Sequence, residues 1–110
     1  MNRSTTVVNV RDKAAVAAAV RAGVYVYVGR TPGGTGEWGN RYSHLPTNVP
    51  GTVPVETREE AIRQHRKEVL DDEERVRRIR RELRGKVLGC WCAPYPCHAQ
   101  TLADIADGLL

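Results

Sequence analysis

The nine residues from Cys90 to His98 (Cys-Trp-Cys-Ala-Pro-Tyr-Pro-Cys-His) hold every cysteine of the chain and one of its three histidines. Thiolates and imidazoles act as nucleophiles, general bases and zinc ligands. A short apolar run, Val87-Leu88, precedes this Cys/His motif (residues 89–98), and a helix-like stretch over 99–109 follows it. We therefore expect the thiols at a strand-to-helix turn, where backbone N–H groups favour anions and thiolates.

A zinc site is one interpretation of the motif. Structural zinc sites usually combine two short ligand pairs that a longer stretch separates, so four ligands within nine residues would be strained. Three of them together with His44 or His65 would relieve that strain. The candidate metal ligands in the motif itself are Cys90, Cys92, Cys97 and His98.

A reactive cysteine is the second interpretation, and a purely structural role is the third. Cys97 would begin a helix next to His98, and a helix N-terminus with a neighbouring imidazolium lowers a thiol pKa below neutrality. This pair would then supply the nucleophile or the acid/base couple. In the structural interpretation, Cys90 and Cys92 are alternating buried residues of a strand, with Trp91 on its opposite face. That interpretation does not explain Cys97 and His98.

A glycine-rich segment over residues 29–41 could bind a ligand. Its glycines allow close approach of a backbone, Arg30 and Arg41 could hold phosphate, Trp38 offers a stacking face, and Asn40 could donate a hydrogen bond. The spacing matches neither a Walker loop nor a dinucleotide fingerprint, because no Gly-Lys-Ser/Thr follows and no helix opens there. An incidental flexible loop is the alternative.

The elements before and after this segment indicate an α/β protein. β-Branched residues predict a strand over 5–10, an Ala-rich stretch predicts a helix over 13–22 between Asp12 and Gly23, and Val-Tyr-Val-Tyr-Val predicts a strand over 24–28. Strand, helix and strand with short connections favour a parallel βαβ unit. Residues 30–55 lack apolar periodicity and predict a long functional loop.

The second half continues the alternation. Thr57 and Glu60 form a capping-box pattern that predicts a helix, and the acidic residues 71–74 divide it, with Asp71 or Asp72 capping a second helix. Gly85 ends that helix, and a third strand starts at 86 or 87. We expect a minimal Rossmann-like domain with a mostly parallel sheet of three or four strands. The second and third strands would then bring the loop and the Cys/His motif to one sheet edge.

Composition sets further limits. A chain of 110 residues with 41% hydrophobic residues predicts a single domain, 1–110. An odd number of cysteines and no signal-like N-terminus predict a cytoplasmic protein, and no segment is long enough to span a membrane. The formal charge is +4, and seven basic residues fall within 75–86, where a phosphate-binding face or a solvated helix surface are the alternatives.

The chain resembles the domain of unknown function 4326 family of bacterial and phage proteins over about residues 7–107. The resemblance rests on Val-Tyr-Val-Gly-Arg at 26–30, Trp-Gly-Asn at 38–40, and Leu-Arg-Gly-Lys-x-Leu-Gly-Cys-Trp-Cys-Ala-Pro-x-Pro-Cys-His at 83–98. Arg41 and Tyr42 stand where the family usually has Pro and an aromatic residue, and Gln100 stands where it often has an acid. The domain of unknown function 488 family has a similar Cys-x-x-x-Pro-x-x-Cys-His ending. Neither resemblance implies a known reaction.

Two functional hypotheses follow. The first is a nucleotide- or nucleic-acid-directed protein that needs no cofactor, an enzyme acting on a nucleotide or glycosidic linkage. Its catalytic residues would be Cys97 and His98, and its ligand-binding residues Arg30, Trp38, Asn40 and Arg41. The alternative is a zinc-stabilised module, of bacterial or phage origin, that binds nucleic acid or a protein through the basic stretch 75–86. The oligomeric state has no sequence signature.

Overall fold

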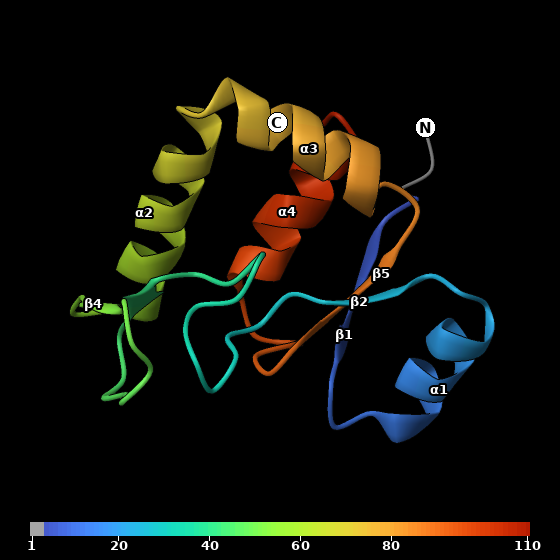
Figure 1. Cartoon of the computed structure of the whole chain (residues 1–110), viewed down its shortest axis with the longest axis horizontal. Coiled ribbons are helices and arrows are strands. Elements are labelled where there is room, and N and C mark those ends of the chain that lie inside the picture. The colour runs from blue at the N-terminus through green and yellow to red at the C-terminus, as the bar shows by residue number, and fades with distance from the viewer. Residues whose placement is uncertain (1–3) are drawn as a thin grey trace.

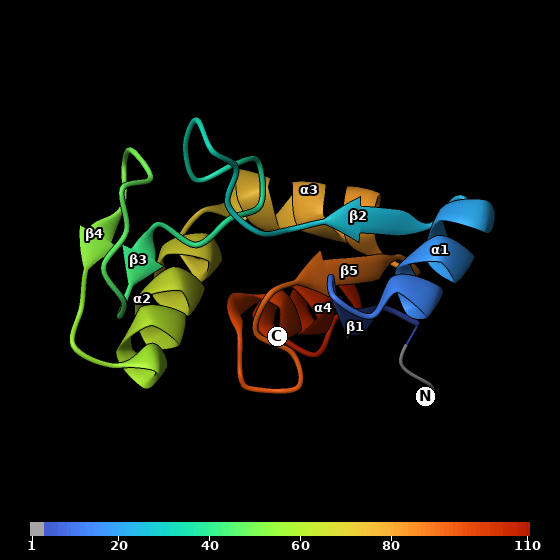
Figure 2. The ribbon, with the colours of Figure 1, turned by 90° about the horizontal axis from the view of Figure 1, so that it is seen from below.

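The computed structural model describes residues 4–110 and contains a parallel three-stranded sheet. Its strands are β1 (Thr6–Asn9), β2 (Tyr25–Tyr27) and β5 (Val87–Cys90), arranged in the order β1-β5-β2. The last strand in the sequence is therefore the central one and pairs with both others; Figure 1 labels the elements, and Figure 2 shows β5 between β2 and β1. This confirms the predicted α/β class and the mostly parallel sheet. In the predicted βαβ unit, β5 lies between β1 and β2, so these two strands are not neighbours in the sheet.

The helix boundaries follow from capping side chains. Helix α1 (Lys13–Arg21) begins where Asp12 accepts a hydrogen bond from the Ala15 N–H. Helix α2 (Arg58–Leu70) begins where Thr57 accepts one from the Glu60 N–H. Asp72 caps α3 (Glu73–Leu83) in the same way, so the predicted division of this helical region is confirmed. Within residues 4–110, no helix has the length and apolarity needed to cross a bilayer.

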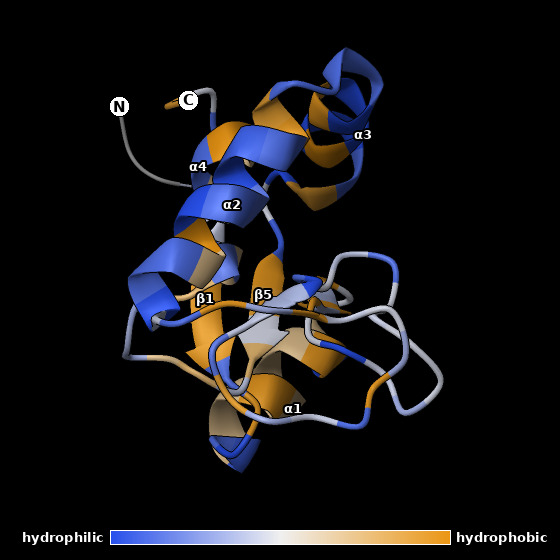
Figure 3. Cartoon of the chain, turned by 90° about the vertical axis from the view of Figure 1, so that its left-hand side faces the viewer, coloured by the Kyte–Doolittle hydropathy of each residue, from blue (hydrophilic) through white to orange (hydrophobic). Residues whose placement is uncertain are grey.

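The helices lie mainly on one side of the sheet. Helix α4 (His98–Ala106) packs against β1 and β5, α3 packs on α4, α2 contacts both α3 and α4, and α1 packs against β2. Apolar residues of the strands lie between the helices, while α2 and α3 carry mostly hydrophilic residues outward (Figure 3). The buried centre of this core includes Val28, Leu88, Leu102 and Ile105, each at most 1% exposed. Burial of this aliphatic surface is the main stabilising contribution of the fold.

The segment expected to be a long loop contains a second, smaller sheet. Strands β3 (Tyr42–Ser43) and β4 (Val53–Pro54) pair in parallel, and β3 packs against α2. Most of the 30–55 segment is loop, and the sequence does not reveal these two strands because two-residue strands are too short to show periodicity. The carboxyl ends of β2 and β5 point toward this segment and α2 (Figure 2). The loop is thereby held against the sheet edge where ligands bind in open α/β folds.

Strand β5 ends at Cys90, before the Cys/His motif is complete. Cys92 therefore lies in the connection from β5 to α4, and the expectation that Cys90 and Cys92 alternate along one strand was wrong. Pro94 and Pro96 follow shortly after, and because proline has no backbone N–H to donate, they prevent a regular strand there. Trp91 is not on an opposite strand face either: it lies after the end of β5 and lines the same pocket as Cys90 and Cys92, with its indole N–H donating to the Tyr27 hydroxyl at 3.0 Å.

Candidate functional site

A pocket of about 380 Å³ lies at the carboxyl edge of the sheet. It is lined by β2 and β5, by the 30–55 segment, by the first turns of α2 and by the start of α4. Of the residues expected at a site, the structure brings together Arg30, Asn40, Cys90, Cys92, Cys97 and His98. Sequence reasoning did not place Tyr27, Tyr42 and Arg58 there, nor did it assign His44 and Trp91 to a ligand pocket. None of the residues lining the pocket carries a carboxylate.

Arg30 and Asn40 build the pocket wall from the loop. The guanidinium of Arg30 donates from Nε to the Asn40 carbonyl at 2.8 Å and from Nη2 to the Tyr42 carbonyl at 3.0 Å. The amide of Asn40 donates to the Ala61 carbonyl in α2 and accepts from the Tyr42 N–H. These bonds tie the loop to α2, so the main task of Asn40 is structural. Arg30 lines the pocket while two of its guanidinium nitrogens hold the loop.

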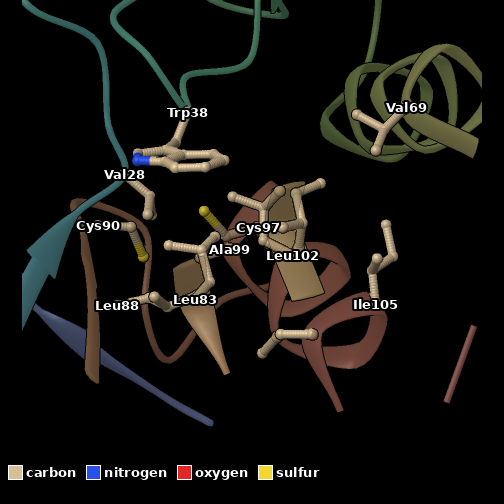
Figure 4. Close-up of a cluster of buried hydrophobic side chains, with 13 residues drawn as sticks. Val28, Trp38, Val69, Leu83, Leu88, Cys90, Cys97, Ala99, Leu102 and Ile105 are labelled. Atoms are coloured by element: carbon tan, nitrogen blue, oxygen red, sulfur yellow. The ribbon is translucent and has the colours of Figure 1, made fainter. Parts of the chain in front are cut away.

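Trp38 and Arg41 lie outside the pocket. The Trp38 side chain is 9% exposed and lies against Val28, Cys90 and Cys97 in the core (Figure 4), with the Arg78 guanidinium 4.6 Å from its ring centre. Its ring could stack on a base only by leaving the core, which corrects the role expected for it. Arg41 pairs with Glu68 and donates to the Tyr42 hydroxyl, which holds it on the outer surface of α2.

The three thiols interact with one another. Cys97, the N-cap residue of α4, forms side-chain hydrogen bonds with Cys90 and Cys92. Those hydrogen bonds raise the pKa of Cys97, while the hydrogen bond from Cys97 lowers the pKa of Cys90 and of Cys92 to about 6. A smaller contribution at Cys92 comes from a hydrogen bond with Arg58. Cys92 is also the only one of the three cysteines that is not fully buried, so the accessible thiolate belongs to Cys92.

His98 is a neutral, oriented imidazole. Its Nε2 lies 2.7 Å from the Val28 carbonyl, which can only accept, so Nε2 carries the proton. Its unprotonated Nδ1 lies 3.4 Å from the Cys97 Sγ. Burial is the main cause that lowers the pKa of His98 to about 4. The imidazolium expected to activate Cys97 is therefore absent at pH 7, and the neutral ring presents only an unprotonated nitrogen to Cys97.

Gln100 has a defined task at the same turn. Its Oε1 accepts a hydrogen bond of 2.7 Å from the Cys97 N–H, which satisfies a backbone donor at the start of α4. Gln100 therefore supports the turn that carries Cys97 and His98 rather than orienting the histidine ring.

The zinc interpretation finds no support in the side-chain placement. Among residues 4–110, no group of three or more His, Cys, Asp or Glu side chains is arranged to hold a metal ion. His98 Nε2 is taken by a carbonyl, and His65 packs against the His98 ring, 5.2 Å between centroids, away from the pocket. The donor set does not fit a tetrahedral ion as it stands.

The basic stretch 75–86 is largely engaged within the molecule. Arg80 and Arg84 donate to carbonyl groups at the end of α4, where cations stabilise the helix dipole. The other arginines of the stretch form ion pairs: Arg75 with Glu68, Arg77 with Glu74, Arg78 with Glu37 and Glu82, and Arg81 with Glu82. These contacts favour a structural role for the stretch over a phosphate-binding face.

The exposure of the three thiols predicts their order of reaction. In the folded protein at pH 7, Cys92 is expected to alkylate with iodoacetamide first, and Cys90 and Cys97 only after denaturation, because reactivity requires an accessible thiolate. Mass spectrometry of timed digests measures this order. Cys92→Ser should remove the fast phase, whereas Cys97 labelling first would contradict the assignment.

The fold and the site together define a small α/β domain with a thiol-lined pocket at the carboxyl edge of a parallel sheet. Residues 8–108 match a family described as a domain of unknown function (DUF4326), and the chain belongs to this family. Comparison with curated proteins and with solved structures gave no match.

Proposed function

We propose that this domain binds a nucleotide in the pocket at the carboxyl edge of the sheet and acts on it with the thiol of Cys92. The observation that carries the proposal is the lining of the pocket. It combines two guanidinium groups, Arg30 and Arg58, with an accessible thiol and contains no carboxylate. Such a pocket attracts an anion and repels no phosphate.

The size and the apolar walls of the pocket suit the rest of a nucleotide. A volume of about 380 Å³ lies within the range of small-molecule sites. The rings of Tyr27 and Tyr42 offer apolar surface for a base, a part that the sequence-based hypothesis had assigned to Trp38. The start of α4 adds a helix N-terminus, which favours negative charge.

The thiol cluster supplies the chemistry of the proposed enzyme. The Cys92 thiolate attacks the anomeric carbon of the bound nucleotide, an S–C bond forms, and the glycosidic C–N bond breaks with its electron pair leaving on the base. The leaving base takes a proton from solvent, and attack by water then releases the sugar and restores the thiolate. Cys97 supports this step because its one thiol proton, donated to Cys92, favours the thiolate of that residue, and His98 lies beside Cys97 with Nδ1 3.4 Å from its Sγ.

Nucleotide binding tests the proposal. We expect nucleoside monophosphates to raise the melting temperature and Arg58→Ala to weaken their binding about tenfold or more, since a charged hydrogen bond contributes about 1.5–3 kcal/mol. Arg66→Ala is the matched control, because Arg66 is exposed on the same helix and away from the pocket. Calorimetry measures the affinities. No binding by any nucleotide, or equal losses in both variants, would overturn the proposal.

The reaction has a separate readout. Incubation with nucleotides should release free base and leave a sugar adduct on Cys92, visible in the intact mass, and Cys92→Ser should abolish both while retaining nucleotide binding. Binding without base release in the wild-type protein would remove the glycosidic step and leave a nucleotide-binding domain.

A further inference from the structure

The loop from β5 to α4, residues 91–97, exposes two large aromatic side chains. Trp91 is 56% exposed and Tyr95 is 67% exposed. The molecule has few aromatic residues, and a ring left in water forgoes the burial that would stabilise the fold. Trp38, by contrast, is buried. The exposure of Trp91 and Tyr95 within one short loop therefore indicates a surface that contacts a ligand.

An arginine lies against each of these rings. The guanidinium carbon of Arg11 is 5.4 Å from the centre of the Trp91 ring, and that of Arg58 is 5.6 Å from the centre of the Tyr95 ring. Arg11 follows β1 and Arg58 begins α2, so the two cations come from distant parts of the sequence. Aromatic rings interleaved with cations are typical of surfaces that bind single-stranded nucleic acid, because bases stack on the rings and phosphates meet the cations.

The 91–97 loop is held in place by hydrogen bonds. Asn9 at the end of β1 donates from Nδ2 to the Trp91 carbonyl at 3.2 Å and to the Ala93 carbonyl at 2.6 Å. The Trp91 indole N–H donates to the Tyr27 hydroxyl, and the Tyr95 N–H donates to the Cys92 carbonyl. The loop backbone and the Trp91 ring are therefore positioned before a ligand arrives, which reduces the entropy lost on binding.

The loop lies next to the pocket. Trp91 is part of the pocket lining, whereas Tyr95 is not, although its arginine partner Arg58 is. Cys92, the accessible thiol, stands between the two aromatic residues in the sequence and contacts Arg58. The ring of Tyr95 therefore lies next to the pocket but outside it, where a nucleotide bound in the pocket would not contact it.

We propose that the nucleotide taken up by the pocket belongs to a single-stranded nucleic acid, whose neighbouring bases stack on Trp91 and Tyr95. This inference rests on the proposed function and specifies its substrate class. The charges of Arg11 and Arg58 match the phosphates of such a strand, and the chain carries a formal charge of +4. A protein partner would need a broader apolar patch, and Leu45 is the one exposed large aliphatic residue in the pocket lining.

Fluorescence anisotropy with labelled single strands of one to eight nucleotides tests this inference. Affinity should rise over the first few nucleotides, fall with added salt, and be weaker for a duplex, whose bases are already stacked. Tyr95→Ala should weaken the binding of an eight-nucleotide strand about tenfold and leave mononucleotide affinity unchanged, while Tyr95→Phe, which retains the ring, should behave as wild type. Val20→Ala, an exposed apolar residue on α1, is the control.

Two outcomes separate this inference from the proposed function. If mononucleotides bind but longer strands bind no tighter, or if Tyr95→Ala has no effect on them, the strand is not the substrate and the nucleotide pocket stands. If neither mononucleotides nor strands bind, both proposals fail. Loss of a protein partner on Tyr95→Ala, with no effect on strand binding, would make the loop a protein interface and overturn the inference.

Discussion

Acidification from pH 7 to pH 4 is expected to remove about 3 kcal/mol of folding free energy through His65 alone. This residue is 1% exposed in α2, and neither of its ring nitrogens has a hydrogen-bond partner within residues 4–110. Burial, with smaller contributions from His98 and Arg75, lowers the pKa of His65 from 6.5 to about 3. Below pH 6.5 the unfolded chain therefore binds a proton that the folded chain excludes, and stability falls until the pH reaches about 3.

Replacing the ring isolates this effect. His65→Leu should be at least as stable as the wild type at pH 7, since it removes a buried polar group without a partner. The stability difference between pH 7 and pH 4 should shrink by about 3 kcal/mol, the amount that His65 contributes. Urea unfolding at a series of pH values measures both, and His44→Leu, at a half-buried position, is the control. An unchanged pH profile in His65→Leu would show that this histidine is not kept neutral by the fold.

Gly39→Ala is expected to destabilise the protein by about 3 kcal/mol, because an added Cβ would overlap the backbone carbonyl group of Thr35. Backbone atoms cannot rotate away as the end of a side chain can. The pocket wall should suffer as well, since Gly39 lies between Trp38 in the core and Asn40, which bonds to α2. Thermal unfolding should show a decrease of more than about 10 °C in the melting temperature.

Gly33→Ala is the matched control for this substitution. It lies in the same loop, and a Cβ added there would have no atom within 4 Å. Its melting temperature should stay within about 2 °C of the wild type, because surface changes without new contacts are nearly neutral. A similar decrease in both variants would indicate general sensitivity of the loop to alanine rather than the contact with Thr35.

Local sequence signals were sufficient for the helices. Asp12, Thr57 and Asp72 each cap a helix where the sequence predicts one, because capping depends on residues within one turn. The strand order was not accessible in this way. Nothing local in Val87–Cys90 shows that it pairs with both β1 and β2, since pairing depends on contacts between distant segments.

The candidate site was predictable in its location but not in the placement of every side chain. The rule that parallel strands end at one edge correctly brought Arg30 and Asn40 to the Cys/His motif. Trp38 was misplaced because a tryptophan in a glycine-rich loop gives no local sign of burial. Arg58 was missed because the sequence of a helix's first turn does not indicate which distant residues its side chains contact. In the structure, Arg58 forms a hydrogen bond with Cys92.

The central position of β5 affects how the chain folds during synthesis. Strands β1 and β2 leave the ribosome first, and residues 28–86 must follow before the strand that pairs with both is available. Until then, two apolar strands have unpaired edges, which exposes the nascent chain to aggregation and to proteases. The sheet, the pocket and the thiol cluster therefore form together in one late, long-range step, so a chain stalled before residue 87 would contain none of them.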